Sequence, residues 1–242
     1  MTCVAGVDGC RAGWLVVVRP LDGVTAPVAR IVATFAEVLA LPERPDCIAV
    51  DIPIGLPERS GIGGRTADIE ARARLGARQS SVFAVPARAA VMATGYAEAC
   101  AVAQRNSEPP RKVSKQTFNL FPKMREVDAL MTPALQARVV ECHPEAAFWA
   151  MNGEAPLALP KKVKSRPNEP GLDLRRRLLA VAGWPVDFLQ ANPFRRAEAG
   201  ADDLLDACAC AWTALRVLRG KAHRFPANPP LDARGLRQEI WA

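Results

Sequence analysis

The sequence predicts an α/β fold, in which a mixed sheet is flanked by helices and interrupted by a helical insertion. Predicted elements of the first 57 residues follow the order strand, strand, strand, helix, strand. Helical patterns then dominate residues 58–135, and a further strand and three helices follow before residue 222. Hairpin strands followed by strands that return after helices are typical of a sheet with antiparallel and parallel pairs.

The composition fits one folded domain with an insertion. Of the 242 residues, 50% are hydrophobic and 24% are charged, which suits a sizeable core. We predict a discontinuous core of residues 1–57 and 136–222, a mainly helical insertion of residues 58–135, and a tail of residues 223–242.

The first three strands form a predicted antiparallel meander. Residues 3–8 are an apolar run that ends in Asp8, and the turn GCRAG leads into a second apolar run at residues 14–20. Residues 28–35 offer a third strand. Apolar runs separated by glycine-containing turns favour hairpins.

The fourth strand ends in a second acid. Residues 35–43 have helical spacing, and the apolar run that follows stops at a Pro/Gly-rich turn directly after Asp51. Because both this strand and the first are apolar throughout, we expect them to be buried parallel neighbours. Asp8 and Asp51 would then lie side by side at one edge of the sheet.

The insertion and the second half of the core are expected to be largely helical. Helices are predicted over residues 66–79, 94–106 and 123–131, with a loop at residues 107–116. The chain then returns to the sheet in a short strand that carries Glu141. The elements expected after it are a helix from Pro144, a basic loop at 159–171, a helix at 172–183, a helix at 199–218 and an irregular tail from Arg224.

The last helix is apolar on most faces, yet it carries Asp202, Asp203 and Asp206. No Lys or Arg occurs between Arg196 and Arg216, so a salt bridge within the helix cannot balance the acids of its first half. Acids in a first turn are favourable as caps, which accounts for one or two of them. Asp206 requires either a distant arginine or a bound metal ion.

Acids at strand ends and on this helix predict a carboxylate cluster. Its candidate members are Asp8, Asp51, Glu141, Asp203 and Asp206. Carboxylates from several elements, completed by water, are what Mg²⁺ or Mn²⁺ prefers. Two such ions about 4 Å apart promote phosphodiester hydrolysis, so we expect a metal-dependent phosphodiesterase.

Several stretches resemble known proteins. The element order resembles the ribonuclease H-like fold, and residues 203–209, DLLDACA, resemble the D-x-x-D-A-x-A signature of RuvC-type Holliday-junction resolvases. The stretches GVDGCRAGW, DIPIGLP, RLGARQSSVF, SKQTFNLFPKMREVD, ECHPEAAF and DDLLDACACA resemble a bacterial family of unknown function described as predicted ribonuclease H-like nucleases, over residues 4–215.

The resemblance implies roles for individual acids. It makes Asp8 a bridging metal ligand and Asp51 a second one, with Asp206 and Asp203 contributed by the last helix. Glu141 lies on a strand position that the resolvases do not use. The neighbouring His143 and Glu145 could each act as a ligand, a base or a helix cap.

The insertion is rich in basic residues. Between Glu58 and Arg138 there are 13 Lys or Arg against 7 Asp or Glu. This excess favours either a solvated basic surface or a site for nucleic acid or another phosphate polyanion. The predicted substrate-binding residues are Arg65, Arg72, Arg78, Lys115, Lys123 and Arg125.

Other classes of protein fit the sequence less well. Seven cysteines without a CxxC pair argue against disulfides and zinc, and only two histidines are present. Neither a signal peptide nor a membrane span is indicated, so a cytoplasmic protein is expected. Two alternatives stay open: an ATP-dependent phosphotransferase or ATPase of the actin-like relatives of this fold, although a Gly/Thr phosphate loop is missing, and a non-catalytic binding protein.

Overall fold

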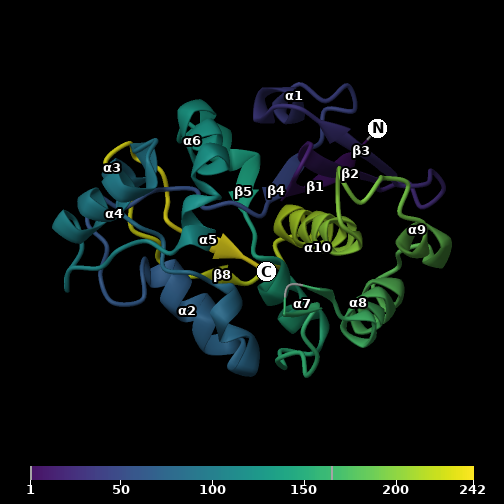
Figure 1. The fold of residues 1–242 in the computed structure, drawn as a ribbon. Coiled ribbons are helices and arrows are strands. Elements are labelled where there is room, and N and C mark those ends of the chain that lie inside the picture. Colours follow the sequence, from purple (N-terminus) through teal and green to yellow (C-terminus); the bar gives the residue numbers. More distant parts are fainter. Residues whose placement is uncertain (1, 165) are drawn as a thin grey trace.

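A five-stranded mixed sheet forms the centre of the protein (Figure 1). The computed structural model describes residues 2–164 and 166–242. The strand order is β3-β2-β1-β4-β5, with antiparallel pairing in the first two pairs and parallel pairing in the last two. The strands are β1 (Cys3–Cys10), β2 (Gly13–Pro20), β3 (Val28–Val32), β4 (Cys47–Val50) and β5 (Val139–Glu141). The predicted ribonuclease H-like mixed sheet, with the first and fourth strands adjacent, is confirmed.

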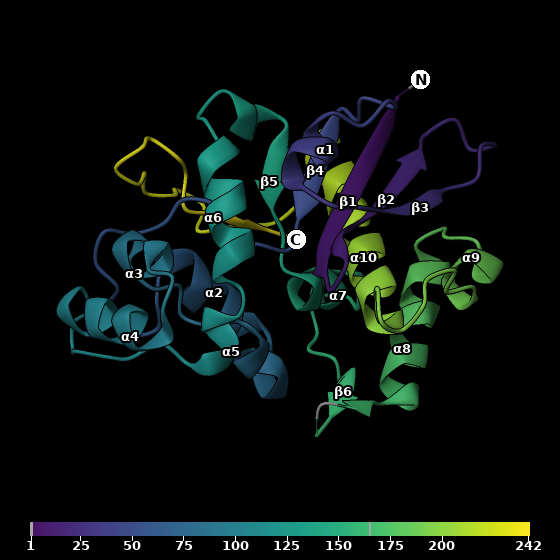
Figure 2. The ribbon, with the colours of Figure 1, turned by 45° about the horizontal axis from the view of Figure 1, so that its top comes forward.

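Helices lie on both faces of the sheet. Those that precede β5 are α1 (Phe35–Leu39), α2 (Thr66–Arg74), α3 (Arg88–Met92), α4 (Tyr96–Arg105), α5 (Lys115–Phe118) and α6 (Phe121–Leu130), with short 3-10 helices η1 (Gly76–Ser81) and η2 (Leu135–Ala137). Those that follow it are α7 (Pro144–Met151), α8 (Glu169–Val181), α9 (Val186–Gln190) and α10 (Ala201–Leu218). In Figure 2 the helices α2–α5 and α8–α10 lie on opposite sides of the molecule.

Helix α10 packs closely on one face of the sheet. It is buried along most of its length and joins β1, β2 and β4 in one apolar cluster, together with α7 and α8. At Gly6 of β1, a Cβ atom would stand 1.9 Å from the carbonyl oxygen of Ala207 and 2.1 Å from the amide nitrogen of Ala211. Only glycine allows the helix backbone to approach the strand this closely.

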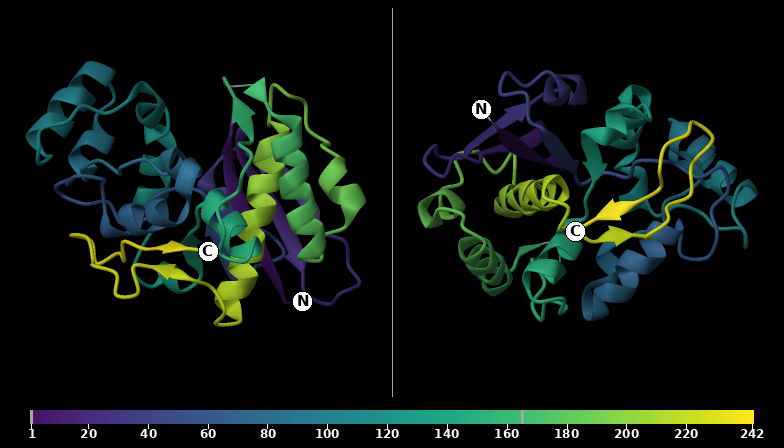
Figure 3. Two further views of the ribbon diagram at one scale, coloured as in Figure 1. Left: turned by 90° about the horizontal axis from the view of Figure 1, so that it is seen from below. Right: turned by 180° about the vertical axis from the view of Figure 1, so that it is seen from behind.

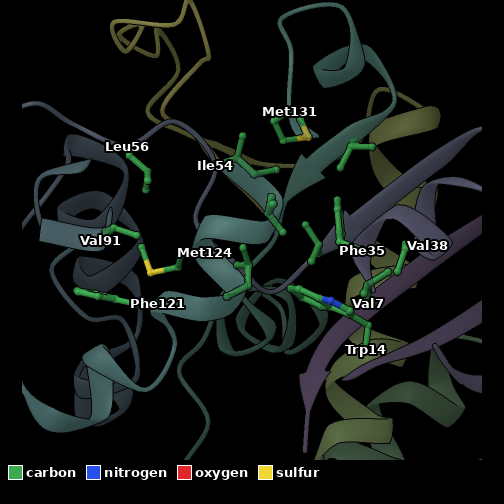
Figure 4. Packing of buried hydrophobic residues seen from close by; sticks show 14 of the residues in the cluster. Val7, Trp14, Phe35, Val38, Ile54, Leu56, Val91, Phe121, Met124 and Met131 are labelled. Carbon is green, nitrogen blue, oxygen red and sulfur yellow. The ribbon is translucent and has the colours of Figure 1, made fainter. Parts of the chain in front are cut away.

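The opposite face of the sheet continues into the insertion. Val7 and Trp14 belong to the same buried cluster as Phe121 and Met124 of α6 and Val91 of α3 (Figure 4). The predicted helical insertion between the fourth and fifth strands is therefore confirmed, and it shares its core with the sheet.

One predicted helix of the insertion ends early. The expected helix over residues 66–79 stops at Arg74, and the 3-10 helix η1 takes its place from Gly76. Gly76 has φ of +49°, a left-handed conformation that terminates an α-helix.

The C-terminal tail is more ordered than the irregular segment expected from the sequence. Short strands β8 (Arg224–Phe225) and β9 (Ile240–Trp241) pair with each other, and Trp241 bridges to Cys142 directly after β5. Figure 3 shows these strands beside α2 and β5. Between them, Asp232 is buried and accepts hydrogen bonds from the backbone of Leu56 and Leu236.

Two further expectations concern cysteines and membranes. All seven cysteines are buried and form no disulfide, as expected for core residues. No helix in the described part of the chain combines the length and the apolar character needed to cross a membrane.

Candidate active site

Asp8 and Asp51 lie next to each other at the carboxyl edge of the parallel strands. The amide of Asp51, directly after β4, donates to the carbonyl of Val7 in β1 at 2.9 Å. Because side chains alternate along a strand, Asp8 shares the face of Gly6, and Asp51 shares the face of Ala49. This is the face that α10 covers, so the two carboxylates and the helix meet there.

A cavity of about 340 Å³ opens in front of these two acids. Asp8 and Asp51 line it, and neither carboxylate accepts a hydrogen bond from the residues that the structure describes. The insertion supplies the facing wall. Its polar contributions are Arg65, Asp68, Ser80, Ser81, Ser114, Gln116, Thr117 and Lys123, and Glu141 of β5 also lines the cavity. Asp8 and Asp51 therefore face a cavity of mixed polar and apolar lining with their oxygens unengaged.

The electrostatic environment disfavours full ionisation of the acids. Burial raises the pKa of Asp8 well above its ordinary value, and repulsion from Asp51 and Asp206 raises it further. Burial also raises the pKa of Asp51, although His143 and Lys161 oppose this rise. An added cation in the cavity would relieve the repulsion.

Asp206 does have a cationic partner, and it comes from outside its helix. Lys161, in the predicted basic loop before the short strands β6 (Lys162–Val163) and β7 (Arg166–Pro167), donates to Asp206 Oδ2. Lys162 pairs with the neighbouring Asp202 at 2.6 Å. The sequence left two partners possible for Asp206, a distant arginine or a metal ion. The structure shows a distant cation, and it is a lysine rather than an arginine.

The pairing with Lys161 is incomplete. Burial raises the pKa of Asp206 to about 7, even though Lys161 opposes the rise. The second oxygen, Oδ1, is buried and has no hydrogen-bond partner among the described residues. Burial lowers the pKa of Lys161, but attraction to Asp206, Asp202 and Asp8 outweighs it and holds the ammonium charged. Asp206 itself does not line the cavity.

Asp203 caps the helix rather than joining the other acids. Its Oδ2 accepts a hydrogen bond from the amide of Gly200 at 2.8 Å, which closes the first turn of α10. Burial raises the pKa of Asp203, and this backbone hydrogen bond opposes the rise. The structure thus gives Asp203 a capping role in place of the predicted metal-site role.

Glu141 is placed on the wrong face for the predicted cluster. It pairs in register with Val50, which points away from α10, and Arg65 binds both of its oxygens at 2.6 and 2.8 Å. The same guanidinium binds Asp68 at 2.7 Å. Arg65 and Glu141 line the cavity but are buried and bind each other, so the structure corrects both predictions: Glu141 is not an open ligand and Arg65 is not an open phosphate-binding group.

Two further predicted substrate-binding arginines are engaged elsewhere. Arg72 donates to the carbonyls of Gly63 and Val82, and Arg125 donates to two carbonyls at the end of α3 at 2.8 and 3.1 Å. Neither lines the cavity. Their guanidinium groups hold turns of the insertion together, which corrects the predicted phosphate-binding role.

Of the six predicted basic residues, only Lys123 supplies an uncompensated positive charge to the cavity. Its ammonium donates to the carbonyl of Gly13 and lies 4.3 Å from the centre of the Trp14 ring. Burial lowers its pKa, against the attraction of neighbouring acids. Lys115 lies over the ring of the single tyrosine, and Arg78 forms no ion pair within the described residues. The predicted basic face beside the acids therefore reduces to one lysine.

His143 and Glu145 have different surroundings. Glu145 pairs with the fully buried Arg175, so it is a structural partner. His143 lines the cavity, with Nε2 3.3 Å from the carbonyl oxygen of Ser81, while its buried Nδ1 has no partner in the described part of the chain. An imidazole with one unengaged nitrogen can accept a proton or a hydrogen bond.

The residues fit a divalent metal ion without forming a finished cage. Within residues 2–164 and 166–242, no three His, Cys, Asp or Glu side chains are arranged to hold a metal. However, Asp8 and Asp51 present unengaged oxygens, and Asp206 Oδ1 is unsatisfied. Mg²⁺ commonly binds one or two carboxylates together with water and substrate phosphate oxygens. Asp8 and Asp51 meet that need.

Lys161 and its ionic partner Asp202 are site features that sequence reasoning missed. The signal for Lys161 was the pair of lysines in a loop predicted to precede the acidic helix. A test restricted to partners within the helix could not detect it.

The comparisons with known proteins give one match. No curated protein and no solved structure matches the chain. The family described as "Protein of unknown function (DUF429)" matches residues 6–231, which include Asp8, Asp51 and the whole of α10. This match covers more than half of the chain, and the protein therefore belongs to that family of unknown function.

Proposed function

We propose that this protein is a metal-dependent phosphodiesterase that acts on nucleic acid. The observation that carries the proposal is the pair of Asp8, which is buried, and Asp51, which is half-buried, side by side at a cavity with raised pKa values and unengaged oxygens. Structural acids are normally paired or hydrogen-bonded when buried. A buried pair without such partners is typical of a functional site.

Asp8 and Asp51 would hold the cation, with Asp206 supporting them from α10. The chemistry that Mg²⁺ or Mn²⁺ supplies at such a site is the activation of water and the neutralisation of phosphate charge. Lys161 fixes the position of Asp206 and keeps part of its negative charge compensated. Lys161 also engages oxygens of Asp206 and Asp202, so fewer carboxylate oxygens stay open to a metal ion than the four acids Asp8, Asp51, Asp202 and Asp206 carry.

The remaining cavity residues suit a phosphate ester. Lys123 places a positive charge on the insertion side of the cavity, where it can bind a phosphate oxygen. The hydroxyl group of Ser80 adds a hydrogen-bond donor, whereas that of Ser81 donates to the carbonyl of Arg78 at 2.8 Å. His143, with its unengaged Nδ1, can accept a proton at the rim.

Hydrolysis of a simple phosphodiester tests the proposal. The purified protein is expected to hydrolyse bis(4-nitrophenyl) phosphate with Mn²⁺ or Mg²⁺ and to lose this activity in EDTA. Asp8→Asn and Asp51→Asn should each lower the rate at least a hundredfold, because each removes a charged ligand.

A matched control is Asp187→Asn, which changes an exposed acid in the first turn of α9. It should retain the parent rate. If Asp8→Asn and Asp187→Asn are equally active, or if the parent has no metal-stimulated activity on this ester or on oligonucleotides, the proposal is wrong.

A further inference from the structure

A second cavity, of about 280 Å³, adjoins the first one inside the insertion. The two cavities share three lining residues, Phe83, Ser114 and Thr117. Thr117 is largely buried, and its amide and hydroxyl bind the hydroxyl of Ser114 at 3.0 and 2.8 Å, which fixes this shared wall. Phe83, Ser114 and Thr117 therefore stand between the cavity of Asp8 and Asp51 and the second cavity.

The second cavity has a different charge from the first. Arg111 and Lys112 line it, and none of its lining residues is acidic. Both side chains are exposed, and neither forms an ion pair with the residues that the structure describes. The loop that carries them is held in place, because the amide of Arg111 donates to the hydroxyl of Ser107 at 2.7 Å. Two uncompensated cations on a fixed loop suit an anion such as phosphate.

We infer that the second cavity is a phosphate-binding subsite and that the substrate is a single-stranded oligonucleotide. The inference rests on the proposed function, since it places the phosphodiester to be cleaved at Asp8 and Asp51. The strand passes Phe83, and the next phosphate along it binds Arg111 and Lys112. The partly buried ring of Phe83 at the junction offers a stacking surface for the intervening base.

The dimensions favour a single strand over a duplex. Cavities of roughly 300–1,000 Å³ hold one small ligand, so each of these two can hold about one nucleotide. Phe83, from the turn after η1, and Ser114 and Thr117, at the start of α5, line both cavities. A cavity that holds about one nucleotide cannot also take in the base-paired partner.

Binding without turnover tests the subsite. The probe is a fluorescein-labelled thymidine trinucleotide, titrated in EDTA and followed by fluorescence anisotropy at several salt concentrations. Arg111→Ala/Lys112→Ala should weaken trinucleotide binding about five- to tenfold. The slope of log affinity against log salt should also become shallower, by about 0.7 for each phosphate that the variant no longer neutralises.

The control variant Arg219→Ala/Lys221→Ala removes the same charge from exposed residues just after the carboxyl end of α10, which line neither cavity. It should bind the trinucleotide as the parent does. Thymidine monophosphate should bind more weakly than the trinucleotide, and a stable duplex of about 12 base pairs should compete poorly. Equal trinucleotide binding by the two double variants, or tighter binding of the duplex, overturns the inference. Hydrolysis of bis(4-nitrophenyl) phosphate by the parent is measured separately, so the subsite and the proposed function can fail independently.

Discussion

Two ionic clusters line one cavity at the same edge of the sheet, and they differ in how completely their acids are hydrogen-bonded. In the first cluster, Arg65 binds both oxygens of Glu141 and one of Asp68, and backbone amides bind the same carboxylates. In the second, Asp8 and Asp51 accept no hydrogen bond from the described residues.

The difference separates a structural role from a functional one. A cluster whose hydrogen bonds are all made within the protein rigidifies the fold and has nothing left to bind. A cluster with unengaged oxygens facing a cavity is less favourable for folding and remains available to a ligand. Both clusters contain acids that the sequence assigned to one site, so burial and charge alone could not distinguish them.

The largest expected effect comes from breaking the satisfied cluster. Arg65→Met leaves Glu141 and Asp68 buried without a cation, and such a loss costs about 3–5 kcal/mol. Chemical denaturation at pH 7.5 measures it, with Arg72→Met as a control that loses only backbone hydrogen bonds. If the Arg65 variant is as stable as the parent but no longer binds oligonucleotide, Arg65 contacts substrate after all.

The next effect concerns the cation of the open cluster. Lys161→Met leaves Asp206 without its cation and Asp202 with Lys162 alone, so the metal-free protein should lose on the order of 2 kcal/mol at pH 8. Millimolar Mg²⁺ should restore more stability to this variant than to the parent, because the ion replaces the missing ammonium. Thermal unfolding with and without Mg²⁺ measures both quantities. An unchanged metal-free stability would show that Lys161 does not compensate these acids.

The open cluster should also make stability depend on pH. Burial raises the pKa of Asp206 to about 7, and burial together with neighbouring acids raises that of Asp8. The folded protein therefore binds more protons than the unfolded chain above pH 4, so metal-free stability should fall as pH rises from about 5 to 8. Asp8→Asn should flatten this fall and add about 1 kcal/mol at pH 8.

The measurement is denaturant unfolding in EDTA at pH 5, 6, 7 and 8. Asp187→Asn should keep the pH dependence of the parent, because this acid is exposed. A parent protein whose stability rises over this range would contradict the repulsion inferred between Asp8 and Asp51.

The sequence predicted the cluster of Asp8 and Asp51 better than the cluster of Arg65, Asp68 and Glu141. Strand order and apolar runs placed Asp8 beside Asp51, because each follows the last parallel pair of β1 and β4, although β1 itself continues to Cys10 beside β2. Glu141 also ends a strand, but its in-register neighbour Val50 faces away from α10, and a shift of one residue reverses the face of a side chain. Register in a strand of three residues could not be read from periodicity.

Long-range partners were the other unpredictable feature. Arg65 and Glu141 are 76 positions apart, and Lys161 and Asp206 are 45 apart. The composition of the insertion indicated excess positive charge, but it did not indicate which Lys and Arg side chains bind groups inside the protein. Arg72 and Arg125 bind carbonyls of nearby turns, and this engagement depends on backbone geometry that only the folded chain defines.

The smallest expected effect tests the boundary of the open cluster at the start of α10. Asp203→Ala removes the hydrogen bond to the amide of Gly200, which should lower stability by about 0.5–1.5 kcal/mol. Asp206, one turn further along, should behave differently, since its charge acts on Asp8 and Asp51 and raises the pKa of Asp8. We expect Asp203→Ala to keep its Mg²⁺-dependent gain in melting temperature and its rate on bis(4-nitrophenyl) phosphate within about twofold, and Asp206→Ala to lose both. If Asp203→Ala loses them as well, the capping acid belongs to the metal site, and the open cluster extends a full turn further toward the amino end of the helix than its hydrogen bonds indicate.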